Sequence, residues 1–296
     1  MSAAHTLLVY GNCQAEAVSV ILRLDPTIAA DFDVRYVPSY ENRRFESLEL
    51  TKADLANCAL LLEQHDSNPF PERAALPASC GTIKFPSIDC NILWPMNATN
   101  PYNPDEPSFP FGRFPYGDRV IITQIDAAKP AADILDYYLN AWDDYKPDLD
   151  RLLDLEIARF SARDAKCDVT MGNFFFERFR TERPLWTINH PTQHFLKELV
   201  ERIVAKASLL DARLRKADVG QTVDNNFLLS PRGPLGIVSV PIHPGVAEHF
   251  QLEWYDPQER YYLFDGTDFG YEDYFKELIE RSIDAKNAGR QGGSLN

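Results

Sequence analysis

Four short apolar runs alternate with polar or helix-like segments in the first third of the chain. Each run is followed by turn-forming residues, which is the pattern of buried strands in a parallel sheet. The runs are Leu7–Tyr10, Val34–Val37, Ala59–Glu63 and Thr82–Phe85. Between them, residues 15–24 and 47–56 have the spacing of amphipathic helices. The alternation predicts an α/β fold with an N-terminal open, mostly parallel sheet and flanking helices.

The pattern changes between residues 91 and 117. This segment is rich in aromatic residues and is interrupted by Pro95, Pro101, Pro104, Pro107, Pro110 and Pro115. Prolines at this density forbid regular elements, whereas the aromatic side chains supply enough apolar surface to pack. We expect a long ordered loop that covers the edge of the sheet, either as a lid or as a connection between domains.

The rest of the chain has mainly helical periodicity. The predicted helices are 131–140, 148–162, 193–208, 211–219 and 271–285, with one strand at 236–240. We therefore expect an α/β region at 1–90 that carries the nucleophile and a mainly helical region at 118–287 that completes the site. The loop at 91–117 would join them into one integrated domain, followed by a flexible tail at 288–296.

Charge and cysteine content narrow the function classes. A formal net charge of −14 argues against nucleic acid as a partner, because phosphate contacts need clustered Lys and Arg. The five cysteines, at positions 13, 58, 80, 90 and 167, form no CxxC pair. This spacing fits neither a disulfide framework nor a zinc site, and it favours reduced thiols in the cytoplasm. The sequence shows neither a basic leader nor a membrane span, so we expect a soluble cytoplasmic protein.

The tetrapeptide Gly11-Asn12-Cys13-Gln14 stands between the first predicted strand and the first predicted helix. A sharp strand-to-helix turn exposes its residues at the carboxyl edge of the sheet, and the first N–H groups of the helix stabilise negative charge there. We expect Cys13 to be a reactive thiolate and a nucleophile. Gly11 permits the turn, while Asn12 and Gln14 supply amide donors beside the thiol. The competing interpretation is a cysteine that simply fills the core.

Other predicted strands end at the same edge. They deliver Pro38-Ser39-Tyr40, Gln64-His65-Asp66 and Pro86-Ser87-Ile88-Asp89 to it. We expect His65 to bind substrate there. Arg43, Arg44 and Lys84 could bind an anionic cofactor or substrate, although each alone is more often a solvated surface charge.

Two His-Pro dipeptides are candidates for a general base. His190-Pro191 follows Asn189, and the proline fixes the turn that carries the imidazole. Asn189 could hold the ring tautomer or the substrate. The second dipeptide is His243-Pro244, for which a structural turn is the default interpretation. Which histidine is the base stays open at this point. No HExxH pattern accompanies either one, so we predict no metal.

A thiolate and an imidazole at one edge are suited to acyl transfer. The reaction could pass through an acyl-cysteine, or His190 could activate an acceptor hydroxyl for direct attack on a thioester. Both routes develop an oxyanion, for which the main-chain N–H groups after Cys13 or the amides of Asn12 and Gln14 are candidate donors.

The same residues carry a family resemblance. A strand leading into Gly11-Asn12-Cys13-Gln14, the segment Ile83-Lys84-Phe85-Pro86 and the later Asn189-His190-Pro191 resemble the WcbI-like polysaccharide biosynthesis acetyltransferases. The segment Val240-Pro241-Ile242-His243-Pro244 is a softer match. The resemblance implies a coenzyme A or acetyl-CoA donor, a carbohydrate acceptor, and acetyl transfer to a sugar hydroxyl in capsular or exopolysaccharide biosynthesis.

Two alternatives remain. One is an SGNH-like esterase or deacetylase with a cysteine nucleophile, although no histidine here has an Asp three residues before it, as the DxxH block of that group requires. The other is a non-catalytic carbohydrate-binding protein that uses the aromatic loop as its surface.

Overall fold

The computed structural model describes residues 5–40, 50–65, 68–104, 106–109, 111–227 and 232–292. The chain divides into two compact units. Unit 1 comprises residues 1–89, 157–179 and 189–236, and unit 2 comprises residues 90–156, 180–188 and 237–296. Both units therefore draw on early and late parts of the chain.

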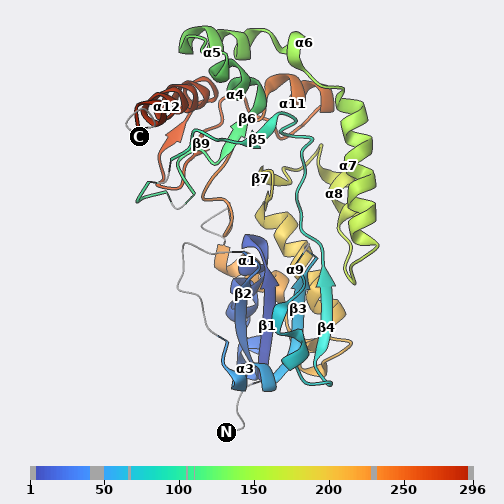
Figure 1. Cartoon of the computed structure of the whole chain (residues 1–296). Coiled ribbons are helices and arrows are strands. Elements are labelled where there is room, and N and C mark those ends of the chain that lie inside the picture. The colour runs from blue at the N-terminus through green and yellow to red at the C-terminus, as the bar shows by residue number, and fades with distance from the viewer. Residues whose placement is uncertain are drawn as a thin grey trace. The chain divides into compact units, whose positions relative to one another are not determined.

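Unit 1 is built on a parallel sheet of four strands in the order β2-β1-β3-β4 (Figure 1). The strands are β1 (His5–Gly11), β2 (Phe32–Pro38), β3 (Cys58–Gln64) and β4 (Gly81–Phe85). The predicted α/β class and all four predicted strands are thus confirmed. The chain leaves β1 toward one side to make β2 and then crosses to the other side to make β3. The carboxyl end of β1 consequently lies at the topological switch point, where open α/β sheets bind ligands.

The two faces of this sheet pack against different elements. One face carries the apolar cluster of Leu8, Tyr10, Cys58, Leu61 and Phe70. Because side chains alternate along a strand, the intervening buried residues point to the opposite face. The longest helices that contact the sheet strands are α1 (Cys13–Leu24), which follows β1, and α9 (Gln193–Ala207), which returns from much later in the chain.

The other helices of unit 1 are short. They are α2 (Pro26–Asp31), α3 (Lys52–Ala56), α8 (Gly172–Arg178), α10 (Val219–Phe227) and the 3-10 helices η1 (Pro71–Ala75) and η2 (Ala212–Lys216). Helix α7 (Leu149–Asp164) contributes its residues from Ile157 onward. His190 opens the two-residue strand β8 (His190–Pro191), just before α9.

Unit 2 is mainly helical. Its helices are α4 (Arg119–Asp126), α5 (Ala131–Asn140), α6 (Trp142–Tyr145), α11 (Pro244–Phe250) and α12 (Tyr271–Gly292). Helices α4, α5 and α12 contribute to a core that includes Ile121, Tyr138, Tyr261 and Phe275. The small strands are β5 (Asn97–Thr99) with β6 (Tyr116–Asp118), β9 (Tyr261–Tyr262) with β10 (Asp268–Phe269), and β7 (Leu185–Thr187). The expected mainly helical C-terminal half is confirmed.

The segment 91–117 is largely irregular, as its prolines predict, except for β5 and the start of β6, which pair antiparallel. It belongs to unit 2. That it covers the edge of the sheet stays a prediction.

Two predicted elements are wrong. The predicted helix 211–219 is the 3-10 helix η2, which ends at an extended Ala217, and α10 begins only at Val219. The carboxylate of Asp25 accepts hydrogen bonds from Asp218 N and Thr222 Oγ1, which separates the two helices. The predicted strand 236–240 is not a strand, because residues 236–238 form a turn and a bend. After them, Ser239 N donates to Tyr262 O and Val240 N donates to Trp186 O.

The predicted helices 15–24, 131–140, 148–162 and 193–208 are confirmed. Of the predicted helix 47–56, residues 52–56 form α3, residues 50–51 are not helical, and residues 47–49 lie outside the described residues. Helix α12 continues past the expected end at residue 285 to Gly292. Within the described ranges, no helix is both long enough and apolar enough to span a bilayer.

Candidate active site

The turn after β1 depends on glycine at position 11. Gly11 has a φ of 156°, and a Cβ atom there would lie 2.5 Å from Gln64 Oε1 and 2.8 Å from the Cβ of Ala15. No larger residue fits between β3 and the first turn of α1. The turn therefore keeps β1, β3 and α1 in close contact at the switch point.

Asn12 caps the helix that begins with Cys13. Its side-chain oxygen accepts a hydrogen bond from Gln14 N at 2.9 Å, and its own N–H donates to Gln64 Oε1 at 2.8 Å. Tyr36 Oη donates to the main-chain oxygen of Gly11 at 3.2 Å. Burial, followed by the nearby Tyr40 and Glu16, raises the pKa of Tyr36 far above its usual value, so Tyr36 stays a protonated donor.

Cys13 is the first residue of α1 and is half-buried. Its thiol therefore stands where the helix dipole and the N–H groups of the first turn favour a negative charge. This is the location that the sequence predicts for a nucleophile.

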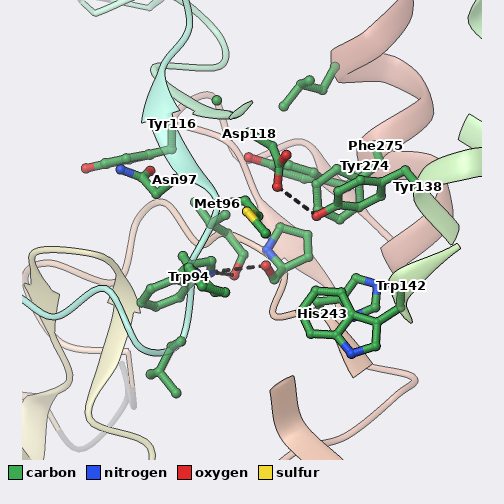
Figure 2. A pocket seen from close by; sticks show the side chains of 16 residues that line it. Trp94, Met96, Asn97, Tyr116, Asp118, Tyr138, Trp142, His243, Tyr274 and Phe275 are labelled. Atoms are coloured by element: carbon green, nitrogen blue, oxygen red, sulfur yellow. Dashed lines mark hydrogen bonds between the residues drawn. The ribbon is translucent and has the colours of Figure 1, made fainter. Parts of the chain in front are cut away.

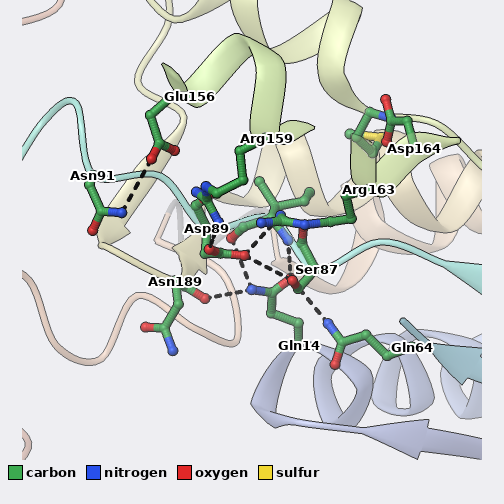
Figure 3. Close-up of polar contacts among 12 residues, drawn as sticks. Gln14, Gln64, Ser87, Asp89, Asn91, Glu156, Arg159, Arg163, Asp164 and Asn189 are labelled. Carbon is green, nitrogen blue, oxygen red and sulfur yellow. Dashed lines mark hydrogen bonds and ion pairs between the residues drawn. The ribbon is translucent and has the colours of Figure 1, made fainter. Parts of the chain in front are cut away.

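Gln14 joins three segments of unit 1 (Figure 3). Its side chain is fully buried. Its Nε2 donates to Ile88 O at 2.9 Å and to Asn189 O at 2.8 Å, and its Oε1 accepts from Ile88 N at 2.8 Å. Both amide hydrogens are thus directed at main-chain oxygens. In this arrangement Gln14 positions other segments, and its amide hydrogens are not directed toward an oxyanion.

The hydrogen bond between Gln14 and Asn189 also positions the segment of His190. Asn189, whose main-chain oxygen accepts from Gln14, immediately precedes His190, and Gln14 immediately follows Cys13. Consecutive Cα atoms are only about 3.8 Å apart, so one hydrogen bond brings the chain segments of Cys13 and His190 together. His190 itself is half-buried, with buried Pro191 and Thr192 after it. The structure thus places the two chain segments side by side within unit 1.

The segment after β4 is held by two arginines of α7. Asp89 forms ion pairs with Arg159 and Arg163, the latter at 2.8 Å, and Ser87 Oγ donates to Asp89 Oδ1 at 2.8 Å (Figure 3). Ile88, between Ser87 and Asp89, contacts Gln14. The predicted delivery of this segment to the edge that carries Cys13 is therefore observed.

Other candidates from the sequence lie in different surroundings. His65 is half-buried directly after β3, and its N–H donates to Phe85 O at 2.7 Å. The main chain of Lys84 pairs with Asp168, and its exposed Nζ lies 3.9 Å from Glu63 Oε2. Arg43, Arg44 and Asp66 fall outside the described residues.

His243 belongs to unit 2 and caps α11. Its Nδ1 accepts from Gly245 N at 3.0 Å, and its ring stacks on Trp142 (Figure 2) at a centroid distance of 4.1 Å. Because Nδ1 is an acceptor, the neutral ring carries its proton on Nε2, which lies 3.2 Å from Tyr145 Oη. Burial lowers the pKa of His243 to about 4. These contacts describe a structural turn, which was the default interpretation.

The cavity beside His243 is small. Its walls include Trp94, Tyr138, Trp142 and the carboxylate of Asp118, but its volume is only about 30 Å³ (Figure 2). Ligand pockets usually measure about 300 Å³ or more. Burial raises the pKa of Asp118 to about 6, yet its oxygens accept from Val120 N, Ile121 N and Tyr138 Oη. This cavity therefore fits a water molecule better than a substrate.

Sequence analysis missed the positioning residues Gln64, Arg159 and Arg163. Gln64 was within a segment expected at the edge, so its position at the end of β3 was a usable signal. The two arginines carried no such signal, because their partner Asp89 is 70 or more residues away. Among the residues that the structure describes, no group of three or more His, Cys, Asp or Glu could hold a metal ion.

Comparison with known proteins gives one family and one solved structure. The family model described as "Polysaccharide biosynthesis enzyme WcbI" matches residues 6–211. The solved structure is of WcbI, described as a novel polysaccharide biosynthesis enzyme, in its native form without a disulfide bond between coenzyme A and one of its cysteines. It superposes with a TM-score of 0.71 at 18% identity and covers 96% of this chain and 93% of its own. No curated protein matches the chain.

Proposed function

Because this chain belongs to the WcbI family of polysaccharide biosynthesis enzymes, we propose that it transfers an acetyl group from acetyl-CoA to a sugar hydroxyl, with Cys13 as nucleophile and His190 as general base. The observation that carries the proposal is the hydrogen bond from Gln14 Nε2 to Asn189 O at 2.8 Å. It joins the residue after Cys13 to the residue before His190, at the switch point of a parallel sheet.

The donor assignment draws on the chemistry of thioesters and on the solved relative. The description of that relative names coenzyme A together with one of its cysteines, although this native form has no disulfide bond between the two. Cys13 is our candidate for the corresponding residue. A thiol at a helix N-terminus is suited to attack the carbonyl carbon of a thioester, since thiolates attack thioesters readily.

The proposed route has two steps, which pass through an acyl-cysteine. The Cys13 thiolate adds to the thioester carbonyl, and the tetrahedral oxyanion is stabilised by main-chain N–H groups at the start of α1. Collapse breaks the carbon–sulfur bond to coenzyme A, whose thiolate leaves and takes from His190 the proton that His190 first removed from the Cys13 thiol. The sugar hydroxyl then attacks acyl-Cys13, and His190 takes the hydroxyl proton and returns it to the Cys13 thiolate as the ester forms.

The phosphates of coenzyme A need cations. Arg43, Arg44 and Lys84 keep this role as candidates from the sequence. The group formed by Asp89, Arg159 and Arg163 adds one net positive charge beside Gln14, and the side chain of Arg159 is 34% exposed. We include Arg159 as a further candidate for phosphate binding.

The experiment is a calorimetric titration of the full chain with coenzyme A and acetyl-CoA, followed by intact-mass analysis after rapid acid quench. We expect micromolar, saturable binding and a covalent gain equal to one acetyl group. Cys13→Ser should bind acetyl-CoA but form no acyl-enzyme, and Cys167→Ser, a half-buried cysteine elsewhere in unit 1, should behave as wild type.

Each other outcome would contradict part of the proposal. If neither coenzyme A nor acetyl-CoA binds, acetyl-CoA is excluded as the donor. If Cys13→Ala still binds acetyl-CoA and transfers the acetyl group, the acyl-cysteine route is wrong and the acceptor attacks the thioester directly. Turnover of p-nitrophenyl acetate without any effect of coenzyme A would favour an esterase, and sugar binding without thioester turnover would favour a binding protein.

A further inference from the structure

Two cysteines of unit 1 that have no part in the proposed chemistry lie beside one another. The sulfur atoms of Cys58 and Cys80 are 3.5 Å apart. Both thiols are reduced in this structure. A disulfide requires about 2.05 Å between sulfurs, so a shift of roughly 1.5 Å would close the bond.

The sheet itself brings the two residues together. Cys58 is the first residue of β3, and Cys80 immediately precedes β4, whose first residue, Gly81, pairs with Leu60. The pairing of β1 with β3 shifts register between Thr6 and Leu7, opposite the start of β3. Cys58 consequently packs in the same apolar cluster as Leu61, against which Cys80 also packs. Neighbouring strands are only about 4.8 Å apart, a spacing that a disulfide can bridge.

The two thiols have different surroundings. Cys58 is 3% exposed, whereas Cys80 is half-buried. The hydrogen bond with Cys58 lowers the pKa of Cys80, and the guanidinium of Arg73 lowers it further, against the effect of burial. The same sulfur contact and burial raise the pKa of Cys58. Cys80 is thus the accessible, more acidic thiol, and Cys58 is the buried partner.

We propose that Cys58 and Cys80 form a reversible dithiol–disulfide pair that closes on reaction with an oxidised low-molecular-weight thiol such as oxidised glutathione. The pair is a redox modification site separate from Cys13. It does not depend on the function proposed above.

The reaction balances as a thiol–disulfide exchange. The Cys80 thiolate attacks one sulfur of oxidised glutathione, forming a mixed disulfide and releasing one glutathione thiolate, which takes a proton. The Cys58 sulfur then attacks the Cys80 sulfur and releases the second glutathione, which receives the Cys58 proton. Two cysteine thiols are oxidised to one disulfide, and one oxidised glutathione is reduced to two glutathione molecules.

The pair lies at the opposite end of the sheet from the candidate active site. Cys58 begins β3, while Gln64, which contacts Asn12, ends it. Seven residues of parallel strand span about 20 Å at roughly 3.3 Å per residue. A disulfide at Cys58 and Cys80 would therefore tie the amino ends of β3 and β4 without blocking Cys13.

The test is thiol mapping of the full chain. The protein is equilibrated with mixtures of oxidised and reduced glutathione, quenched with acid, denatured, alkylated and digested for mass spectrometry. We expect a linked peptide pair containing Cys58 and Cys80, a loss of two alkylated thiols, and full recovery after dithiothreitol. Cys80→Ser should abolish the linked pair, whereas Cys167→Ser should leave it unchanged.

Two results would overturn the proposal. One is full alkylation of Cys58 and Cys80 under conditions in which another cysteine of the chain already carries glutathione. The other is a mixed disulfide that accumulates on Cys80 and never resolves onto Cys58. Both are read from the wild-type chain, so the test holds even where a substitution at buried Cys58 prevents folding.

Discussion

The same dipeptide, His-Pro, occurs in both units and has different surroundings in each. In unit 2, His243 caps α11, stacks on Trp142 and is turned inward beside Tyr145. In unit 1, Thr192 is the cap residue of the following helix, so His190 is not the cap, and it follows Asn189, which is bound to Gln14. His243 is therefore part of a structural turn, whereas His190 lies in a segment that is hydrogen-bonded to the segment of Cys13.

The comparison teaches that neighbours far away in sequence decide what a motif does. The ring of His243 contacts Trp142 and Tyr145, which are about a hundred positions away, and the His190 segment contacts a residue 175 positions away. Neither histidine shows its role in the dipeptide alone. The following predictions test that difference, beginning with the largest expected effect.

Gln14→Ala should produce the largest loss of stability. It removes two buried hydrogen bonds and one partly buried one, and leaves the main-chain groups of Ile88 and Asn189 without this partner. Each unsatisfied buried group costs about 1–3 kcal/mol, so we expect a loss of about 3–5 kcal/mol in the free energy of unfolding. Urea denaturation measures it. Gln221→Ala, which changes an exposed glutamine of α10, is the matched control and should cost less than about 0.5 kcal/mol. A loss below 1 kcal/mol in Gln14→Ala would show that Gln14 does not hold these segments.

His243→Ala should destabilise the chain by about 2–4 kcal/mol, because it removes a helix cap and a side chain stacked on Trp142. His243→Asn keeps a cap acceptor and should recover about 1 kcal/mol of that loss. Thermal and urea unfolding of the two variants give both values. Equal stability of wild type and His243→Ala would rule out the structural role.

Lowering the pH should reduce the difference in the free energy of unfolding between wild type and His243→Asn. Burial lowers the pKa of folded His243 to about 4, against about 6.5 in the unfolded chain. Between these values the unfolded state binds the proton first, so stability is lost as the pH falls from 6.5 to 4, by up to about 3 kcal/mol. The raised pKa of Asp118, about 6, makes the folded state more stable as the pH falls through the same range. Asp118 is present in both proteins, so its contribution cancels in the difference between their free energies of unfolding. A pH-independent difference between the two unfolding curves would contradict the lowered pKa.

Lys84→Ala should have the smallest effect on stability. Its ammonium is exposed and lies 3.9 Å from Glu63, which already pairs with Arg73. Exposed ion pairs contribute about 0–1 kcal/mol, so the change should stay below about 0.5 kcal/mol in urea denaturation. A clear loss of coenzyme A affinity in the same variant would assign Lys84 to phosphate binding, and an unchanged affinity would remove it from the candidates.

The sheet and the turn at Cys13 were predictable because their signals are local. Four apolar runs bounded by turn residues located β1 to β4, and Gly11 marked a turn in which a Cβ would contact Gln64. The site beyond the turn was less predictable, because Gln14 contacts Ile88 and Asn189 across 74 and 175 residues. The periodicity at residues 211–219 also misled, since the hydrogen bonds of Asp25 that separate η2 from α10 come from the other end of the chain.

The most direct test of the account compares the two histidines in one assay. Release of coenzyme A from acetyl-CoA is followed with a panel of sugar acceptors in wild type, His190→Ala and His243→Asn. We predict that His190→Ala loses about 10²- to 10⁴-fold in rate, as expected for a general base, while folded His243→Asn retains wild-type turnover. The reverse result, with His190→Ala active and His243→Asn inactive, would contradict the assignment of the active site to unit 1.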